Sequence, residues 1–150
     1  MSDISEAKAQ LEQLFASQRL AVLGTHNNGQ PYGSLVAFAA TDDLRDILFA
    51  TTRSTRKYAN LSADSRVSML IDSRSNEDID FHAGIAATAA GRAEEVSKDE
   101  GDPFLDIFLE KHPYLREFVL SPTCALLRVR VDTYYVVSRF QNVVEIHINR

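Results

Sequence analysis

The sequence predicts a mainly β protein, an antiparallel barrel with a few peripheral α-helices. Three observations favour this fold class. About seven segments carry the apolar or alternating pattern of strands. Most of these segments are joined by short links, and helical spacing is confined to a few stretches. A sandwich fits this pattern less well, and a βαβ fold requires a regular alternation of strands and helices that the chain lacks.

The N-terminal residues 3–17 are predicted to form an amphipathic helix. Ile4, Leu11, Leu14 and Phe15 recur at helical spacing. We expect this helix to lie with its apolar face on the body of the barrel.

Four strand-like segments follow. Asn27–Pro31 contains Asn-Gly, which supplies the positive φ that a tight hairpin turn between two apolar segments requires. The second of these segments ends at a turn over 41–43. Third and fourth strands are predicted at 46–52 and 66–72.

The C-terminal part returns to strands after one helical region. Residues 84–96 are a fifth strand, whose many small residues fit either an interface or a tightly packed barrel wall. Residues 98–119 have helical spacing, and Pro113 is expected to divide them into two helices. The ranges 123–131 and 134–148 are strand-rich again.

Length and composition are those of one soluble globular domain over residues 1–150. The hydrophobic fraction is 45% and the charged fraction 25%. The formal net charge of −5 argues against a nucleic-acid or anionic-membrane binder, because both normally need a basic face.

The single cysteine and the N-terminal residues give an indication of the cellular compartment. Cys124 excludes a disulfide within one chain, and its apolar neighbours predict a buried thiol. No apolar run approaches the ~18 residues of a spanning helix, and the acidic N-terminus is unlike a signal peptide. A cytoplasmic location is expected.

The run ILFATTRSTRKYANL, residues 47–61, gathers hydroxyl and cationic side chains where a strand ends and a helix begins. Such a junction binds anions, because the first N–H groups of the helix are free and the helix dipole is positive there. An alternative is a solvated face whose cations pair with Asp42, Asp43 or Asp64. The glycine-rich P-loop pattern is absent.

This run also resembles a known signature, that of the FMN-binding split-barrel family, the pyridoxamine 5'-phosphate oxidase-like flavoproteins. The resemblance covers roughly residues 18–96 clearly and the rest loosely. The matching motifs are Phe49-x-Thr51, Thr55-Arg56-Lys57, Asn60-Leu61, Arg66-Val67-Ser68 and Gly91-Arg92-Ala93. The resemblance implies a Greek-key split β-barrel, a bound FMN and a homodimer with flavin at the subunit interface.

It also implies a cofactor site. The FMN phosphate would contact the following six residues: Thr51, Thr52, Ser54, Thr55, Arg56 and Lys57. The flavin ring would lie along the second strand, against the backbone of Ser34, Leu35 and Val36. Candidates for contacts from the second subunit are Arg139, Phe140 and Gln141, because a guanidinium or amide near the flavin N1/O2 edge stabilises the reduced anion.

Two departures put vitamin B6 oxidation in doubt. The second strand lacks the Arg and Lys of the pyridoxamine phosphate oxidases, and His147 lacks an Arg two residues before it. The resemblance then implies an FMN-dependent oxidoreductase acting on an unidentified small molecule, with no catalytic residue assigned.

Two other functions stay open. One is a flavin or haem carrier without turnover, in which His82 or His147 is the iron ligand to test. The other is a barrel-shaped interaction protein without a cofactor. No metal site is expected, because the spacing of the four histidines fits no ligand pattern.

Overall fold

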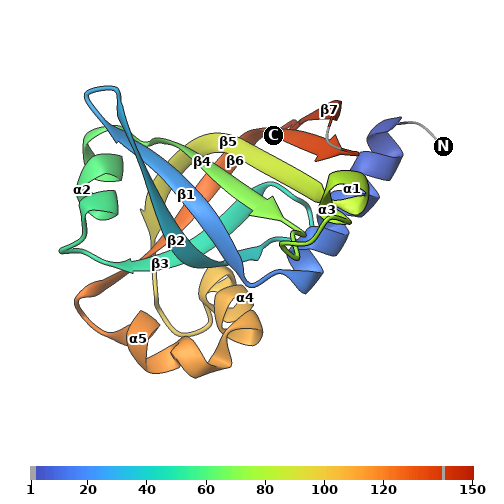
Figure 1. Cartoon of the computed structure of the whole chain (residues 1–150). Helices are drawn as coiled ribbons and strands as arrows, with labels where there is room; N and C mark the ends of the chain where they lie inside the picture. The colour runs from blue at the N-terminus through green and yellow to red at the C-terminus, as the bar shows by residue number, and fades with distance from the viewer. Residues whose placement is uncertain (1–2, 140) are drawn as a thin grey trace.

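A computed structural model describes residues 3–139 and 141–150. Within these residues seven antiparallel strands form one sheet, in the order β3-β2-β1-β4-β5-β6-β7, and pairing of β3 with β6 closes β1–β6 into a barrel (Figure 1). The strands are β1 (Leu20–Asn27), β2 (Gln30–Ala40), β3 (Asp46–Thr52), β4 (Arg66–Asp72), β5 (Ile85–Val96), β6 (Cys124–Ser138) and β7 (Asn142–His147). The mainly β, antiparallel barrel predicted from the sequence is confirmed.

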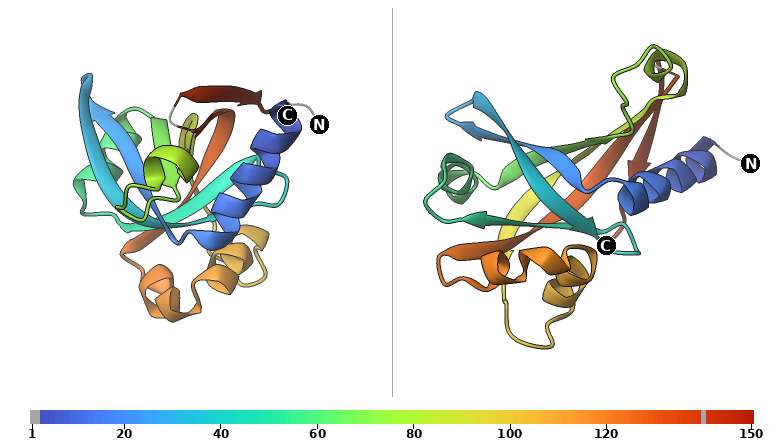
Figure 2. Two further views of the ribbon diagram at one scale, coloured as in Figure 1. Left: turned by 45° about the vertical axis from the view of Figure 1, so that its right-hand side comes forward. Right: turned by 60° about the horizontal axis from the view of Figure 1, so that its bottom comes forward.

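Helices surround this barrel. They are α1 (Asp3–Ser17), α2 (Arg56–Ala63), α3 (Asp80–Ala83), α4 (Pro103–Lys111), a 3₁₀ turn η1 (Pro113–Leu115) and α5 (Arg116–Leu120). Helices α1 and α2 lie at opposite ends of the barrel, and α4 and α5 lie outside it, below β3 in Figure 1 (see also Figure 2). None of the described helices is long and apolar enough to cross a membrane.

The barrel is split between β2 and β3. These strands pair only over 38–40 and 47–49. Residues 30–36 of β2 pair with β1 alone, so in the described part of the chain one edge of β2 has no strand partner. The end of β3 is held instead by β6, where Thr52 pairs with Cys124. The split therefore leaves free backbone groups beside the turn that follows β3.

Several predicted elements are confirmed. The helix over 3–17 and the strands over 46–52 and 66–72 have the expected bounds. The Asn-Gly hairpin forms with φ of 51° at Asn28 and 85° at Gly29.

The C-terminal predictions need correction. The two ranges 123–131 and 134–148 do not divide at 132–133, because β6 runs unbroken to Ser138. The irregular residues there form a bulge opposite Ala90 and Gly91. The helical region also begins later, at Pro103, where Asp102 caps α4. The four-residue α3 was not predicted.

Two apolar clusters hold the elements in place. Helix α1 places Leu11, Leu14 and Phe15 on the barrel interior, where the Phe15 ring packs against Phe38 and Tyr134. Outside the barrel, α4 and α5 cover β3 and β6 with a second cluster made of Ala39, Leu48, Leu105, Phe108, Val119 and Leu126. Cys124 is 1% exposed, as predicted.

Candidate functional site

The turn between β3 and α2 is tied together by its own threonines. Thr55 caps α2, and its Oγ1 accepts from the N–H of Tyr58 at 3.4 Å. The same hydroxyl donates to the Thr52 carbonyl at 2.8 Å and lies 3.0 Å from Thr51 Oγ1. The hydroxyls of Thr51 and Thr55 are thus committed to the shape of the turn.

Arg53, at the start of this turn, is a structural cation. Its Nη2 is 2.5 Å from Glu95 Oε2 on β5, and its Nη1 donates to the Pro122 carbonyl at 2.7 Å. Tyr58 donates to the other oxygen of the same carboxylate at 2.8 Å. Burial alone raises the pKa of Glu95, but the hydrogen bonds from Arg53 and Tyr58 outweigh burial and hold this pKa below its usual value. Glu95 therefore fastens the turn to β5.

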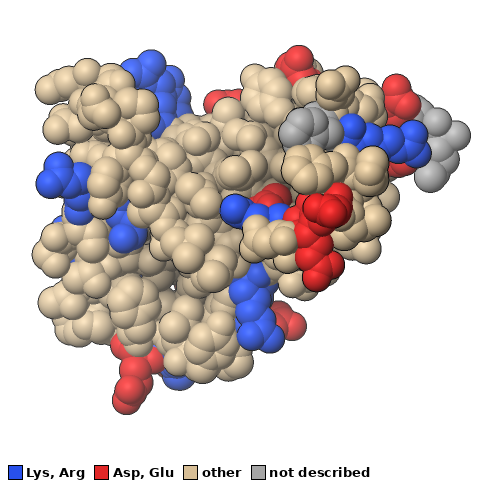
Figure 3. Space-filling model, viewed as in Figure 1, with Lys and Arg blue, Asp and Glu red and all other residues tan. Residues whose placement is uncertain are grey.

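Arg56 and Lys57, at the helical end of the turn, have no such partner. Within residues 3–139 and 141–150 neither side chain forms an ion pair or a hydrogen bond. Arg56 Cζ lies 5.8 Å from the centroid of the Tyr32 ring on β2. Their backbone N–H groups belong to the first helical turn and have no intrahelical partner. Lys and Arg atoms are visible over this end of the molecule in Figure 3.

Two of the three carboxylates proposed from the sequence as partners for these cations are engaged elsewhere, and Asp42 forms no ion pair with any described residue. Asp64 Oδ2 lies 2.6 Å from Arg66 Nη2 and 3.1 Å from His26 Nε2. Asp43 accepts from the Thr41 hydroxyl at 2.6 Å. The solvated-face alternative thus describes Arg53, although its partner is Glu95, and leaves the helical end of the turn uncompensated.

The strand predicted to meet the flavin ring lies on the free edge of the split. Leu35 is 63% exposed, whereas Val36 is buried in the barrel. Ser34 Oγ is buried and has no hydrogen-bond partner among the described residues. A buried hydroxyl normally has one, so the hydrogen-bonding capacity of this atom is unused.

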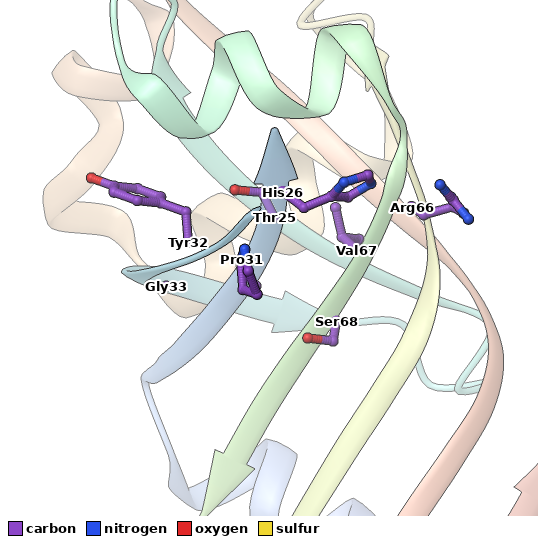
Figure 4. A pocket seen from close by; sticks show the side chains of 9 residues that line it. Thr25, His26, Pro31, Tyr32, Gly33, Arg66, Val67 and Ser68 are labelled. Atoms are coloured by element: carbon purple, nitrogen blue, oxygen red, sulfur yellow. The ribbon is translucent and has the colours of Figure 1, made fainter. Parts of the chain in front are cut away.

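Sequence reasoning missed a cleft beside this edge. It has a volume of about 590 Å³ and lies between the β1–β2 hairpin and β4 (Figure 4). Its lining consists of Gly24, Thr25, His26, Pro31, Tyr32, Gly33, Arg66, Val67 and Ser68. None of the site residues predicted from the sequence lines it. The cleft meets the β3–α2 turn at Tyr32, the residue that Arg56 approaches.

One sequence signal could have located the cleft. Gly24 and Gly33 stand either side of the Asn-Gly turn and pair with each other. A Cβ on Gly24 would come within 2.5 Å of Ser68 Oγ. Two glycines that face each other across a hairpin leave room above the sheet.

The two contacts of His26 and the ion pair of Arg66 with Asp64 hold the rim of the cleft. His26 Nδ1 accepts from the Gly29 N–H at 3.2 Å, which places the imidazole proton on Nε2, facing Asp64. The Arg66 guanidinium beside Asp64 holds the pKa of that carboxyl well below its usual range. Both nitrogens of His26 are therefore occupied, and the hairpin is tied to the end of α2.

The candidates for second-subunit contacts lie far from the turn within one chain. Arg139 and Gln141 are exposed in the link between β6 and β7. Thr52 pairs with the first residue of β6, and this link follows the last, roughly 45 Å along the strand. Phe140 lies outside the described residues. A single chain does not bring these residues together with the β3–α2 turn.

The remaining histidines are dispersed. His112 is buried, with Nε2 2.7 Å from the Phe38 carbonyl. His82 and His147 are exposed, and His147 Nδ1 lies 3.2 Å from Thr133 Oγ1. In the part of the chain that the structure describes, no group of three or more His, Cys, Asp and Glu side chains could hold a metal ion.

Solved structures share this fold at low sequence identity. A heme binding protein from Mycobacterium smegmatis has a TM-score of 0.81 and 20% identity over 94% of this chain and 57% of its own. This chain therefore spans little more than half of that protein. A FAD-binding protein from Mesorhizobium loti gives 0.66 and 16%, covering 86% and 90% of the two chains. HutZ from Vibrio cholerae, a heme storage protein, gives 0.69 and 14%, covering 88% and 94%.

These likenesses establish the fold, and the family follows from the sequence itself. No curated protein sequence matches the chain closely enough to count as a relative. The family model for pyridoxamine 5'-phosphate oxidase, however, matches residues 7–138. Since this match spans most of the barrel, the chain belongs to the pyridoxamine 5'-phosphate oxidase-like split-barrel family.

Proposed function

We propose that the chain binds FMN with its phosphate at the β3–α2 turn, and that it is an FMN-dependent oxidoreductase acting on a small molecule. One observation carries this proposal. Arg56 and Lys57 are consecutive residues with no carboxylate partner among the described residues, at the positive end of a helix, in a chain of net charge −5. Mutual repulsion makes that arrangement unfavourable unless an anion compensates it.

The donors around these cations fit a phosphate group. The hydroxyls of Thr52 and Ser54 make no hydrogen bond to the described residues, so they are available with Arg56 and Lys57. A guanidinium can donate to two phosphate oxygens at once. In this proposal Thr51 and Thr55 shape the turn, and the other four residues hold the phosphate.

The β2 edge fits the flavin ring. Ser34 Oγ offers an unused hydrogen-bonding group, and the unpaired backbone edge of β2 offers N–H and C=O groups at regular spacing. The bound FMN would supply the hydride or electron transfer. The protein would orient the ring along the edge of β2.

Homodimer formation is part of the proposal. The outer face of the sheet carries exposed apolar side chains, among them Leu20, Leu35, Leu70, Tyr135 and Val143. A contiguous face of this kind favours a protein partner. In such a dimer, Arg139 and Gln141 of the second copy would contact the flavin bound to the first copy. Sedimentation equilibrium tests the dimer, and Leu35→Asp is expected to give a monomer.

Haem binding is the second candidate. Two solved proteins with this fold are described as a heme binding and a heme storage protein. Here His82 and His147 are the exposed imidazoles that could reach an iron. A Soret band on addition of haemin, lost in His82→Ala or His147→Ala, would favour this candidate over flavin.

The placement of the phosphate is tested by FMN titration, followed through flavin fluorescence. Arg56→Ala/Lys57→Ala is expected to weaken binding by about 1.5–3 kcal/mol for each lost contact. The control is Lys8→Ala/Arg116→Ala, which removes the same charge from exposed helical positions. Undiminished affinity in the first variant would contradict the proposed placement.

Turnover needs a separate measurement. Anaerobic reduction of the bound flavin by NADH or NADPH should be faster than that of free FMN if the chain is an oxidoreductase. Binding without accelerated reduction by any donor would indicate a carrier.

A further inference from the structure

A second group of cations lies across three neighbouring strands. Arg66 of β4 pairs directly with Arg92 of β5, which pairs directly with Arg130 of β6. Residues opposite each other on adjacent strands point to the same face, with Cβ atoms about 5 Å apart. The register therefore sets three guanidinium side chains in one row on the outside of the barrel.

Only one member of this row is neutralised. Arg66 donates to Asp64 through Nε and Nη2. Across residues 3–139 and 141–150, no carboxylate lies within ion-pair distance of Arg92 or Arg130. Like charges directly opposite each other destabilise a sheet, so the row is unfavourable without a counter-ion.

The two unpaired arginines line a cavity of about 420 Å³. Its other lining residues are Ser65, Ala93, Glu94, Asp132 and Arg150. The charges among these are largely committed. Glu94 Oε1 lies 2.5 Å from Arg128 Nη2, and Arg150 Nη2 lies 3.4 Å from Asp46 Oδ1. Asp132 lines the cavity beside the two arginines, and Asp46 lies directly opposite Arg130 on β3 but pairs with Arg150. The lining therefore keeps a net positive charge.

A β-bulge forms the wall of this cavity. The register shifts between Ala90 and Gly91, which pair with Thr133 and Val131. Asp132, between these two, has no partner residue on β5. A Cβ on Gly91 would collide with the Arg130 carbonyl oxygen. Glycine thus permits the close approach of β5 and β6 that sets Arg92 beside Arg130.

This cavity is separate from the β3–α2 turn. Thr52 pairs with Cys124 on β6, and Arg130 is six residues further along the same strand, about 20 Å away. One ligand phosphate cannot reach both places.

We propose that Arg92 and Arg130, with the Ser65 hydroxyl at the rim, bind the phosphoryl group of a small molecule. Two guanidinium forks offer the donors that match the tetrahedral oxygens of a phosphate. The two guanidinium charges outweigh the single negative charge of Asp132, so a phosphate is attracted to the cavity. This second anion site does not depend on flavin binding.

Calorimetric titration at constant ionic strength tests the proposal, with inorganic phosphate and glycerol 3-phosphate as probes. Both are added to the full chain carrying Arg56→Ala/Lys57→Ala, so that binding at the turn does not contribute. We expect saturable binding, weakened at least tenfold by Arg92→Gln or by Arg130→Gln. Tighter binding of the ester identifies an organic phosphate as the ligand, and equal binding identifies free phosphate.

Melting temperatures show whether the variants still fold. Phosphate should raise the melting temperature of the parent and not that of Arg92→Gln/Arg130→Gln. Without phosphate the double variant should melt no lower than the parent, because repulsion is relieved. Lys8→Gln/Arg116→Gln is the charge-matched control and should keep the phosphate response. Absence of binding in the parent, or its retention in the Arg92→Gln/Arg130→Gln variant, would overturn the proposal.

Discussion

The two ends of the β3–α2 turn carry the same charge and use it differently. Arg53 is part of the fold, because its guanidinium pairs with Glu95 and donates to the Pro122 carbonyl. Within the described residues the side chains of Arg56 and Lys57 form no ion pair or hydrogen bond, and Arg56 lies over the Tyr32 ring. A cation is therefore informative about ligand binding only once its internal partners have been counted.

The largest loss of stability is expected from a change at the contact that holds α2 on the barrel. Asn60 is buried, and its Nδ2 donates to Thr25 Oγ1 at 3.1 Å, which seats α2 on β1. Asn60→Ala leaves that buried hydroxyl unpaired and should cost about 2 kcal/mol of unfolding free energy in urea. Ser62→Ala, on the exposed side of the same helix, should cost less than about 0.5 kcal/mol. Equal losses would show that α2 is not held by this bond.

A smaller effect separates the two kinds of cation. Glu95→Gln removes the charge that Arg53 and Tyr58 share and should lower the unfolding free energy by about 1 kcal/mol, since the pair is partly exposed. Arg56→Ala/Lys57→Ala should change it by less than about 0.5 kcal/mol. The contrast fails if the second variant is the less stable of the two.

Ser34→Ala is expected to separate stability from binding. Deleting a buried, unpaired hydroxyl should leave the stability of the cofactor-free chain unchanged or raise it by about 0.5 kcal/mol. If the hydroxyl serves FMN, the same change weakens flavin affinity by about 1 kcal/mol. A loss of stability with unchanged affinity would assign Ser34 to the barrel alone.

The smallest expected effect is on the stability of the protein at acidic pH. Asp64 has a pKa below its ordinary value of 3.8, chiefly through its hydrogen bonds from Arg66. A lowered carboxyl pKa contributes stability that is present above the unfolded value and is lost as pH falls towards the folded one. Unfolding free energies measured between about pH 5 and pH 2 should therefore decline less steeply in Asp64→Asn. An unchanged slope would show that Asp64 does not contribute to the loss of stability in acid.

Local pattern was enough for most elements. The helix over 3–17, the Asn28-Gly29 hairpin and the strand over 46–52 depend on residues close in sequence, so periodicity and turn chemistry predict them. The unbroken β6 was missed, because a bulge in a paired strand looks like a break when the partner strand is unknown.

The candidate site divides in the same way. The strand-turn-helix order around 47–61 is written in the sequence, and so is the family signature carried by Arg56 and Lys57. The 590 Å³ cleft was not foreseen, because it is bounded by a hairpin and by β4, some 40 residues further along the chain.

By itself the sequence determined the strand pattern that predicts a barrel, the position of the β3–α2 turn and the concentration of positive charge there, since each depends on local order. Only the tertiary structure decided which cations stay free. Glu95 reaches Arg53 across 42 positions of the chain, and strand register alone sets Arg92 beside Arg130. Charge pairing acts through space over a few ångströms. These distances are set by the folded chain and cannot be read from the order of its residues.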